Sequence, residues 1–261
     1  TPCVIKPAFG FASYGVVKVE KEYKLDEIIE KIRITTSPNK KESFKNYNGN
    51  LLVEEYIQGR VISIDGIVQD GNIFIAGSVE FTMGPEPWFT QEAYKIPALL
   101  TKEQLLASEK LAKTAVHALG FDNCGFHCEQ KVTNDGPVLL EIAARLPGGC
   151  IPTCYERATG TNPLSNLVDL WLGRKIAMPP VSYKKHVIER PMYPLKKGTL
   201  TKLKVLESTK NMEGLWLFKV NEEIGNIVTT YPEVPKAIYT YGLEAANDQE
   251  LQNKITKLES Q

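Results

Sequence analysis

The chain has 261 residues, of which 43% are hydrophobic and 24% are charged, and its 31 basic residues balance 31 acidic ones. This composition is typical of a globular protein with one large core or two modest ones. A formal net charge of zero excludes a general attraction to nucleic acid or anionic membranes, so any basic site must be local. Neither a membrane-spanning apolar run nor a signal-peptide pattern occurs, so we expect a cytoplasmic protein with no membrane or nucleic-acid partner.

The first twenty residues predict a strand, a glycine-bearing loop and a second strand, with the strands at residues 3–6 and 16–19. The loop contains residues that allow tight turns, namely Gly10, Ser13 and Gly15. Such a loop can turn backbone N–H groups toward a phosphate, and Lys6 would add a positive charge beside it. The pattern is neither a Walker loop nor a Rossmann fingerprint, and an ordinary hairpin with a surface lysine is the alternative.

A helix and three strands are predicted next. Asp26 can cap a helix that runs to about Ile34, and a polar loop follows over residues 37–50. The strands cover residues 51–57, 61–68 and 73–81. Glu54 and Glu55 lie in mid-strand, so one must face inward unless the strand lies at an edge or a cleft. A strand leaving a pocket could offer its backbone to an adenine edge; an edge strand with two solvated acids is the alternative.

Residues 82–100 mix prolines, aromatic rings and acids, as expected of a loop built for a ligand or an interface. Thr101 and Gln104 predict a capping box for a helix that Gly120 ends. A further helix is predicted from Asn162 and Pro163 to Gly173.

The strongest boundary signal is Pro179-Pro180, which predicts two domains, residues 1–178 and residues 181–261. The second domain reads as a small α+β unit with a terminal helix from about Asp248. Its expected strands cover residues 187–192, 203–206, 215–220 and 227–231.

Five cysteines occur in a chain without a secretion signal, so reduced thiols are the default. Four of them form two pairs with three intervening residues, Cys124 with Cys128 and Cys150 with Cys154. Zinc sites usually have two intervening residues, and strand alternation places Cys128 opposite to the neighbouring His127. Buried apolar thiols are therefore favoured over a zinc cluster.

A hairpin is predicted from Gly125 to Leu146, because two arms of β-forming residues flank Asn134-Asp135-Gly136. If the loop is centred on Asp135, Glu129 and Glu141 lie directly opposite each other. The face that they share is expected to include His127, Lys131, Leu139 and Arg145.

Opposed carboxylates with Cβ atoms about 5 Å apart destabilise a sheet unless a positive charge lies between them. Mg²⁺ is the economical candidate, because proteins bind it through one or two carboxylates together with water and substrate phosphates. Arg145 would add a guanidinium suited to a phosphoryl or carboxylate oxygen. The alternative is that Glu129 and Glu141 are solvated on an outer face.

Three motifs together resemble the ATP-grasp superfamily over roughly residues 1 to 175. V-I-K-P-A-F-G-F-A-S-Y-G resembles the lysine strand and phosphate-covering loop, and L-V-E-E-Y-I-Q-G resembles the adenine-contacting strand and hinge. H-C-E-Q followed by E-I-A-A-R-L resembles the metal-binding pair and the catalytic arginine. The resemblance implies an α+β fold of antiparallel sheets with flanking helices. Within the superfamily, L-amino-acid ligases and other carboxylate–amine ligases, which share folds with biotin carboxylase, look most similar.

The resemblance implies ATP and Mg²⁺ as cofactors and assigns site residues. Catalytic roles fall on Lys6 and Arg145, nucleotide binding on Lys6, Gly10, Ser13, Gly15, Glu54, Glu55 and Ile57, and metal binding on Glu129 and Glu141. Two positions depart from the family pattern. Ala143 stands where many members have an asparagine metal ligand. A ribose-binding acid often follows the hinge glycine in the family, but Val61 stands near that glycine here, which leaves Ser63 and Asp65 on the same strand face as substitutes.

The implied reaction is ATP-dependent ligation, in which a carboxylate is activated as an acyl-phosphate and captured by an amine, both being small molecules such as amino acids. Glu80, Glu86 and Trp88 are the expected acceptor-side residues. The alternatives are a biotin-carboxylase-like enzyme and a nucleotide-binding module without turnover. The resemblance also implies a fragment that lacks the N-terminal domain, which need not be active alone, and a homo-oligomer is conceivable.

Overall fold

The structure is a computed structural model, and it describes residues 2–10, 13–21, 24–37, 44–87, 89–204, 207–230 and 236–260. The strands are β1 (Cys3–Pro7), β2 (Val17–Val19), β3 (Leu51–Glu55), β4 (Arg60–Gln69), β5 (Asn72–Met83), β6 (Gln91–Ile96), β7 (Cys124–Thr133), β8 (Gly136–Ala143), β9 (His186–Met192), β10 (Gly198–Thr199), β11 (Leu215–Val220), β12 (Ile227–Val228) and β13 (Tyr239–Ala245). The helices are α1 (Leu25–Thr35), α2 (Lys102–Ala118), α3 (Ile151–Thr159), α4 (Pro163–Trp171), α5 (Glu207–Lys210) and α6 (Asp248–Glu259).

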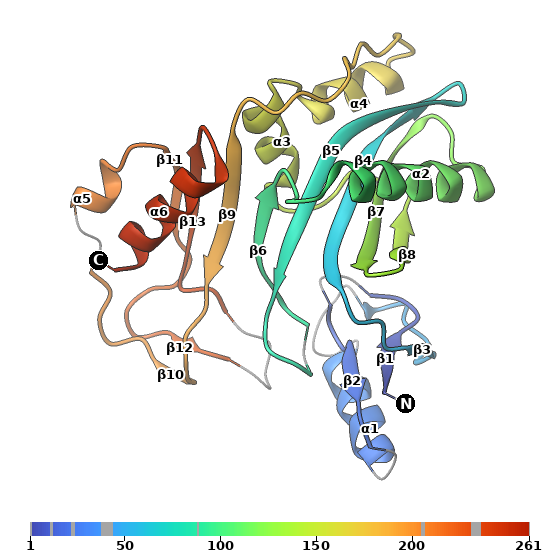
Figure 1. Ribbon diagram of the computed structural model, residues 1–261. Helices are drawn as coiled ribbons and strands as arrows, with labels where there is room; N and C mark the ends of the chain where they lie inside the picture. Colours follow the sequence, from blue (N-terminus) through green and yellow to red (C-terminus); the bar gives the residue numbers. More distant parts are fainter. Residues whose placement is uncertain are drawn as a thin grey trace.

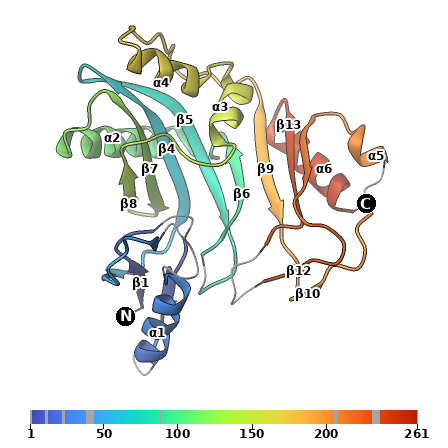
Figure 2. The ribbon, with the colours of Figure 1, turned by 180° about the vertical axis from the view of Figure 1, so that it is seen from behind.

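A small N-terminal unit consists of an antiparallel sheet in the order β2-β1-β3 with α1 against one face. The apolar side chains of this contact are Ile5, Val17, Val19 and Ile32. Because side chains alternate along β1, Lys6 lies on the face away from α1. Asp26 lies in the first turn of α1 rather than capping it, since Lys24 is the N-cap residue. In Figures 1 and 2 this unit lies at the end of the large sheet opposite α4.

The large sheet has the strand order β11-β13-β9-β6-β5-β4-β7-β8, and the strand pairs described are antiparallel. Helices α2 and α6 cover one face and α3 covers the other (Figures 1 and 2). The capping box of α2 is confirmed, with the Thr101 hydroxyl accepting from the Gln104 N–H. The predicted fold class, antiparallel sheets with flanking helices, is thus confirmed.

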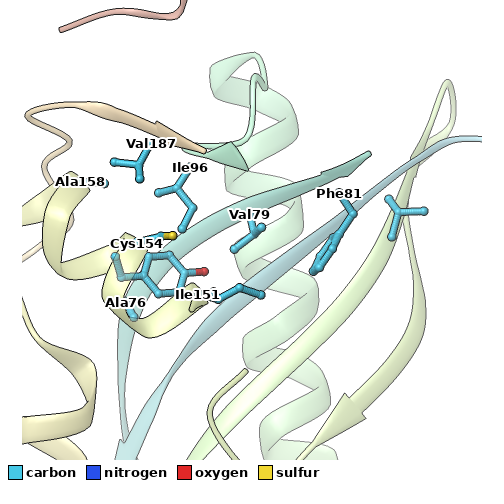
Figure 3. Packing of buried hydrophobic residues seen from close by; sticks show 10 residues of the cluster. Ala76, Val79, Phe81, Ile96, Ile151, Cys154, Ala158 and Val187 are labelled. Carbon is cyan, nitrogen blue, oxygen red and sulfur yellow. The ribbon is translucent and has the colours of Figure 1, made fainter. Parts of the chain in front are cut away.

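Helix α3 was not predicted, although its packing defines the face that carries the candidate site. Its apolar side chains pack against β5, β6 and β9 in one buried cluster (Figure 3), whose labelled members are Ala76, Val79, Phe81, Ile96, Ile151, Cys154, Ala158 and Val187. The preceding Pro147-Gly148-Gly149 and the internal Pro152 mask the helical pattern in the sequence. Only packing against the sheet makes this nine-residue segment a stable helix.

The central hairpin forms as predicted, and Glu129 is the direct partner of Glu141. The loop has two residues rather than three, because Thr133 pairs with Gly136. A register shift beyond Glu129 restores the expected pairing. Leu139 therefore pairs with Gln130, and its predicted place on the Glu129 face is wrong.

The C-terminal strands continue the large sheet, because β9 pairs with β6 across the proposed boundary at Pro179-Pro180. The division into residues 1–178 and 181–261 stays a prediction. The terminal helix is confirmed as α6, and the expected strand at 227–231 reduces to β12 within the described residues.

Strand β6 forms inside residues 82–100, the segment for which the sequence predicts a loop. In the part of the chain that the structure describes, none of the helices combines the length and the apolar character that spanning a bilayer requires.

A substitution at Gly66 tests the close packing of β4 in the middle of the sheet. A Cβ atom there would lie 2.2 Å from the Phe74 carbonyl oxygen and 2.7 Å from the Phe126 ring. We expect Gly66→Ala to lower the free energy of unfolding by about 1–3 kcal/mol or more. Gly198→Ala is the control, because a Cβ there meets nothing within 4 Å, and its effect should stay within about 0.5 kcal/mol. Urea unfolding of both variants measures the difference, and equal stabilities would contradict this packing.

Candidate active site

The candidate site lies on the α3 face of the large sheet, where β4, β7 and β8 bring polar side chains into one row. Glu129 pairs with Glu141 on one side and with Ser63 on the other, while His127 pairs with Asp65. Paired residues share a face, so the two glutamates and His127 lie together. Cys128, on the opposite face, is fully buried against α2, and all five cysteines are free.

A buried chain of hydrogen bonds on the same face of the sheet supports Glu129. The two ring nitrogens of His127 lie 2.6 Å from Asp65 Oδ1 and 3.0 Å from Glu129 Oε1. The other oxygen of Asp65 accepts from the Ser63 hydroxyl at 2.9 Å and from the Tyr155 hydroxyl at 2.6 Å. Tyr155 belongs to α3, so this chain links the helix to Glu129.

This network corrects the expectation for ribose binding. Ser63 and Asp65 are 0% exposed, because β4 is a central strand covered on both faces. Their polar atoms are directed to one another, to His127 and to Tyr155. Neither residue can reach a ribose without breaking the core, so the expectation is wrong.

The charge state of His127 follows from its two acidic partners. Burial alone lowers its pKa, but the charge of Asp65 and the hydrogen bonds with Asp65 and Glu129 outweigh it and raise the pKa to about 10. His127 is therefore a cation at neutral pH and partly compensates the carboxylate of Glu129.

Arg145 lies in the connection between β8 and α3, on the exposed surface of the chain. Its guanidinium donates to the Leu146 carbonyl at 3.1 Å. Gly149 has a φ of 62°, a conformation that favours glycine and turns the chain into α3. In the chain, Arg145 thus comes two residues after the end of β8 and before the first turn of α3.

Lys6 and Glu54 form an ion pair at 2.7 Å on the face of the small sheet away from α1. Glu54 and Glu55 lie on β3, which is an edge strand of that sheet, and their side chains alternate between its faces. The structure places Lys6 beside the acid expected at the adenine. Gly10, Ser13 and Gly15 are described, but residues 11 and 12 of the same loop lie outside the described residues, so the phosphate-covering role stays a prediction.

Lys131 is a basic residue that the sequence analysis treated only as a neighbour of Glu129. Its ammonium donates to the carbonyl of Ile57, the expected adenine-framing residue, and lies 4.7 Å from the Tyr56 ring centre and 5.7 Å from that of Phe89. Desolvation lowers its pKa. The sequence feature that indicates a place for Lys131 in the site is its position two residues after Glu129, which puts both side chains on the same strand face.

The loop between β5 and β6 contacts the small sheet through Glu86. Its carboxylate accepts from Lys18 at 2.6 Å and from the Tyr56 hydroxyl, and these bonds lower its pKa. Glu80 lies on the opposite face of the large sheet, bonded to Arg60 and to the Leu99 N–H, so its expected acceptor role is wrong. Trp88 lies outside the described residues.

The donor set fits Mg²⁺ better than zinc. Among the described residues, no group of three or more His, Cys, Asp and Glu side chains could hold a metal ion by itself. Two opposed carboxylates suffice for Mg²⁺, which takes its remaining ligands from water and phosphate oxygens. Ala143 is paired with His127 and contributes no donor, so the two glutamates are the protein ligands that this arrangement offers.

Comparison with known families decides the assignment. The model of the ATP-grasp domain matches residues 1–153, which is more than half of the chain. The chain belongs to the ATP-grasp family. Within this ATP-grasp chain, the matched region contains Lys6, Glu54, Glu129, Glu141 and Arg145.

Proteins similar to this ATP-grasp chain include one curated relative and two solved structures. Alanine–anticapsin ligase of Bacillus subtilis (strain 168) is 26% identical over 193 residues, covering 69% of this chain and 40% of the relative. The crystal structure of L-amino acid ligase from Bacillus licheniformis has a TM-score of 0.86 at 21% identity over 100% of this chain and 63% of that one. The biotin carboxylase from Campylobacter jejuni has a TM-score of 0.69 at 18% identity, covering 99% of this chain and 56% of that one. The chain therefore spans about 40% of the length of the curated relative.

Tyr155→Phe tests the buried support of this ATP-grasp site. Removing the hydroxyl deprives Asp65 of one donor inside the core, so we expect a loss of about 1–3 kcal/mol in the free energy of unfolding. Tyr47→Phe is the control, because Tyr47 donates to Asn50 in an exposed setting, and its effect should be clearly smaller. Denaturant unfolding of both variants gives the comparison; equal losses would contradict the role of the network.

Proposed function

We propose that this chain is the nucleotide- and substrate-binding part of an ATP-dependent carboxylate–amine ligase. The observation that carries the proposal is the direct opposition of Glu129 and Glu141 on one sheet face, in a chain of the ATP-grasp family. The similarity to alanine–anticapsin ligase supports amino acids as the small-molecule substrates. ATP and Mg²⁺ are the proposed cofactors.

The reaction would proceed in two steps. A carboxylate oxygen of the first substrate attacks the γ-phosphorus of ATP, the bond to the bridging oxygen breaks, and ADP leaves. The amine of the second substrate then attacks the acyl carbon, inorganic phosphate leaves, and the proton of the amine passes to phosphate or water. No protein nucleophile is required, so catalysis is positioning and charge stabilisation.

Each end of the nucleotide has a proposed binding group on this chain. Lys6 would neutralise phosphate charge under the loop that carries Gly10, Ser13 and Gly15, while Glu54 and the backbone of Glu55 and Ile57 would bind adenine. Lys131 fixes the Ile57 carbonyl and thereby the hinge. Mg²⁺ held by Glu129 and Glu141 would supply charge neutralisation at the phosphates.

Arg145 is the proposed group for the transferring phosphoryl and the acyl-phosphate. Its guanidinium is always charged and suits the planar arrangement of two oxygens. The expectations of a cytoplasmic location and of a homo-oligomer remain part of this proposal.

Two other functions would be supported by different results of the experiments below. A biotin-carboxylase-like enzyme would share the fold, but the segment after Glu80 lacks the run of basic and glutamine residues expected for bicarbonate. A nucleotide-binding module without turnover is compatible with Ala143 in place of a third metal ligand.

Glu141→Gln tests the metal site directly. Loss of one of two carboxylates should weaken Mg²⁺-dependent ATP binding by at least about tenfold, since ligand and support changes at metal sites cost about 10–100-fold in affinity. Calorimetric titration with ATP in the presence and absence of Mg²⁺ measures the change. Asp135→Asn removes the same charge from the turn of the same hairpin and should leave binding unchanged. Unaltered binding in Glu141→Gln would contradict the site.

The complete protein that contains this chain should release ADP only when two amino substrates are supplied. A coupled assay with a panel of amino acids, alone and in pairs, checks this expectation, with bicarbonate as the comparison. Release with bicarbonate would favour the carboxylase, and binding of ATP without any release would favour the module.

A further inference from the structure

Glu189 on β9 is a buried acid with one unused oxygen. The residue is 8% exposed, and its Oε2 has no hydrogen-bond partner among the residues that the structure describes. Burial raises the pKa of Glu189, and the neighbouring backbone N–H and thiol of Cys150 offset only part of the effect. A buried carboxylate oxygen without a partner is costly, so a donor from a ligand would stabilise it.

The nearby cations serve a different acid. Glu244 on the adjacent β13 pairs with Val187, two residues from Glu189, and therefore lies on the same face. Its two oxygens accept from Arg157 at 2.7 Å and from Lys185 at 2.6 Å. Glu244 is thus a satisfied structural acid, whereas Glu189 keeps an oxygen without a partner among the described residues.

Glu189 also faces the candidate site. It pairs with Tyr94 of β6, and burial, the charge of Glu189 and then the charge of Glu129 are among the influences that raise the Tyr94 pKa. Tyr94 therefore lies within electrostatic reach of both acids. Cys150, the N-cap of α3, follows the Arg145 connection, and a Cβ on Gly149 would meet only the Tyr94 ring, at 3.8 Å.

The spacing of the sheet suits a substrate that runs from the metal end toward Glu189. Three strands separate β7 from β9, so the backbones of Glu129 and Glu189 are about 19 Å apart at about 4.8 Å per strand. Acidic and aromatic side chains extend from both ends, so the distance between the side-chain groups is shorter than this backbone distance. A phosphoryl group at Glu129 and an amino group at Glu189 would then lie on either side of Tyr94 on β6.

We propose that Glu189 binds the protonated primary amino group of an amino substrate, with Tyr94 forming the wall beside it. This inference rests on the proposed ligase function and deepens it, because it makes Glu189 the residue that selects amino acids over simple carboxylates. The amino group can belong to the substrate that is activated or to the one that captures it. In either case it supplies the donors that Oε2 lacks.

Glu189→Gln in the complete protein is the test. The amide keeps the size of the side chain and one of its oxygens but removes the negative charge. We expect the KM of one amino substrate to rise at least tenfold, while the KM of ATP and the calorimetric binding of Mg²⁺ and ATP stay unchanged. Glu244→Gln is the control for loss of an acid on the same face, and it should leave all KM values unchanged.

Two comparisons identify which amino group is bound. If the activated substrate is held, its KM alone rises, and its des-amino analogue is used equally by wild type and Glu189→Gln. If the capturing substrate is held, only its KM rises.

The same variant separates this inference from the proposed function. Calorimetry with the twenty standard amino acids in the presence of ADP and Mg²⁺ gives a readout without turnover. Binding that is weakened at least tenfold in Glu189→Gln supports the ammonium site even if the wild type releases no ADP, which would remove only the ligase proposal. No binding to the wild type, unchanged affinity in the variant, or equal rises in the KM of ATP and of both substrates would overturn the inference.

Discussion

The arrangement depends on one electrostatic constraint, the direct opposition of Glu129 and Glu141 across β7 and β8. Like charges at this separation repel, and a sheet tolerates them only when cations or ligands compensate. His127, two residues from Glu129 on β7, compensates part of the negative charge, and Asp65 fixes the orientation of the His127 ring. The acids thus remain on the surface of a rigid sheet, where a divalent cation can bridge them.

The support for that pair comes from segments distant in sequence. The Tyr155 hydroxyl on α3 donates to Asp65, so the helix that follows the Arg145 connection also supports the acid that orients His127. The connection that carries Arg145 therefore leads into the helix that supports Asp65.

The large sheet also joins the ATP-grasp site to the C-terminal part of the chain. β9 extends the sheet beyond β6 and brings Glu189 to the end of the Arg145 connection through Cys150. The C-terminal strands are thus structurally continuous with the sheet that carries Glu129 and Glu141. In the proposals above, substrate selection resides there, whereas the nucleotide-binding groups belong to the small sheet and to β7.

The sequence alone determined the features that depend on local order. Turn residues and period-two alternation predict the hairpin and the pairing of Glu129 with Glu141, and the capping residues predict where α2 begins. The register shift that produces this pairing with a two-residue loop is not visible in the sequence. The neighbours of each strand are not visible either. Asp65 resembles a ligand residue because the sequence does not show that β4 is covered on both faces, and the sequence does not show which face of the large sheet Glu80 occupies. Helix α3, the Tyr155 link and the unpaired oxygen of Glu189 arise only from long-range packing, since burial and hydrogen-bond partners are set by the tertiary fold.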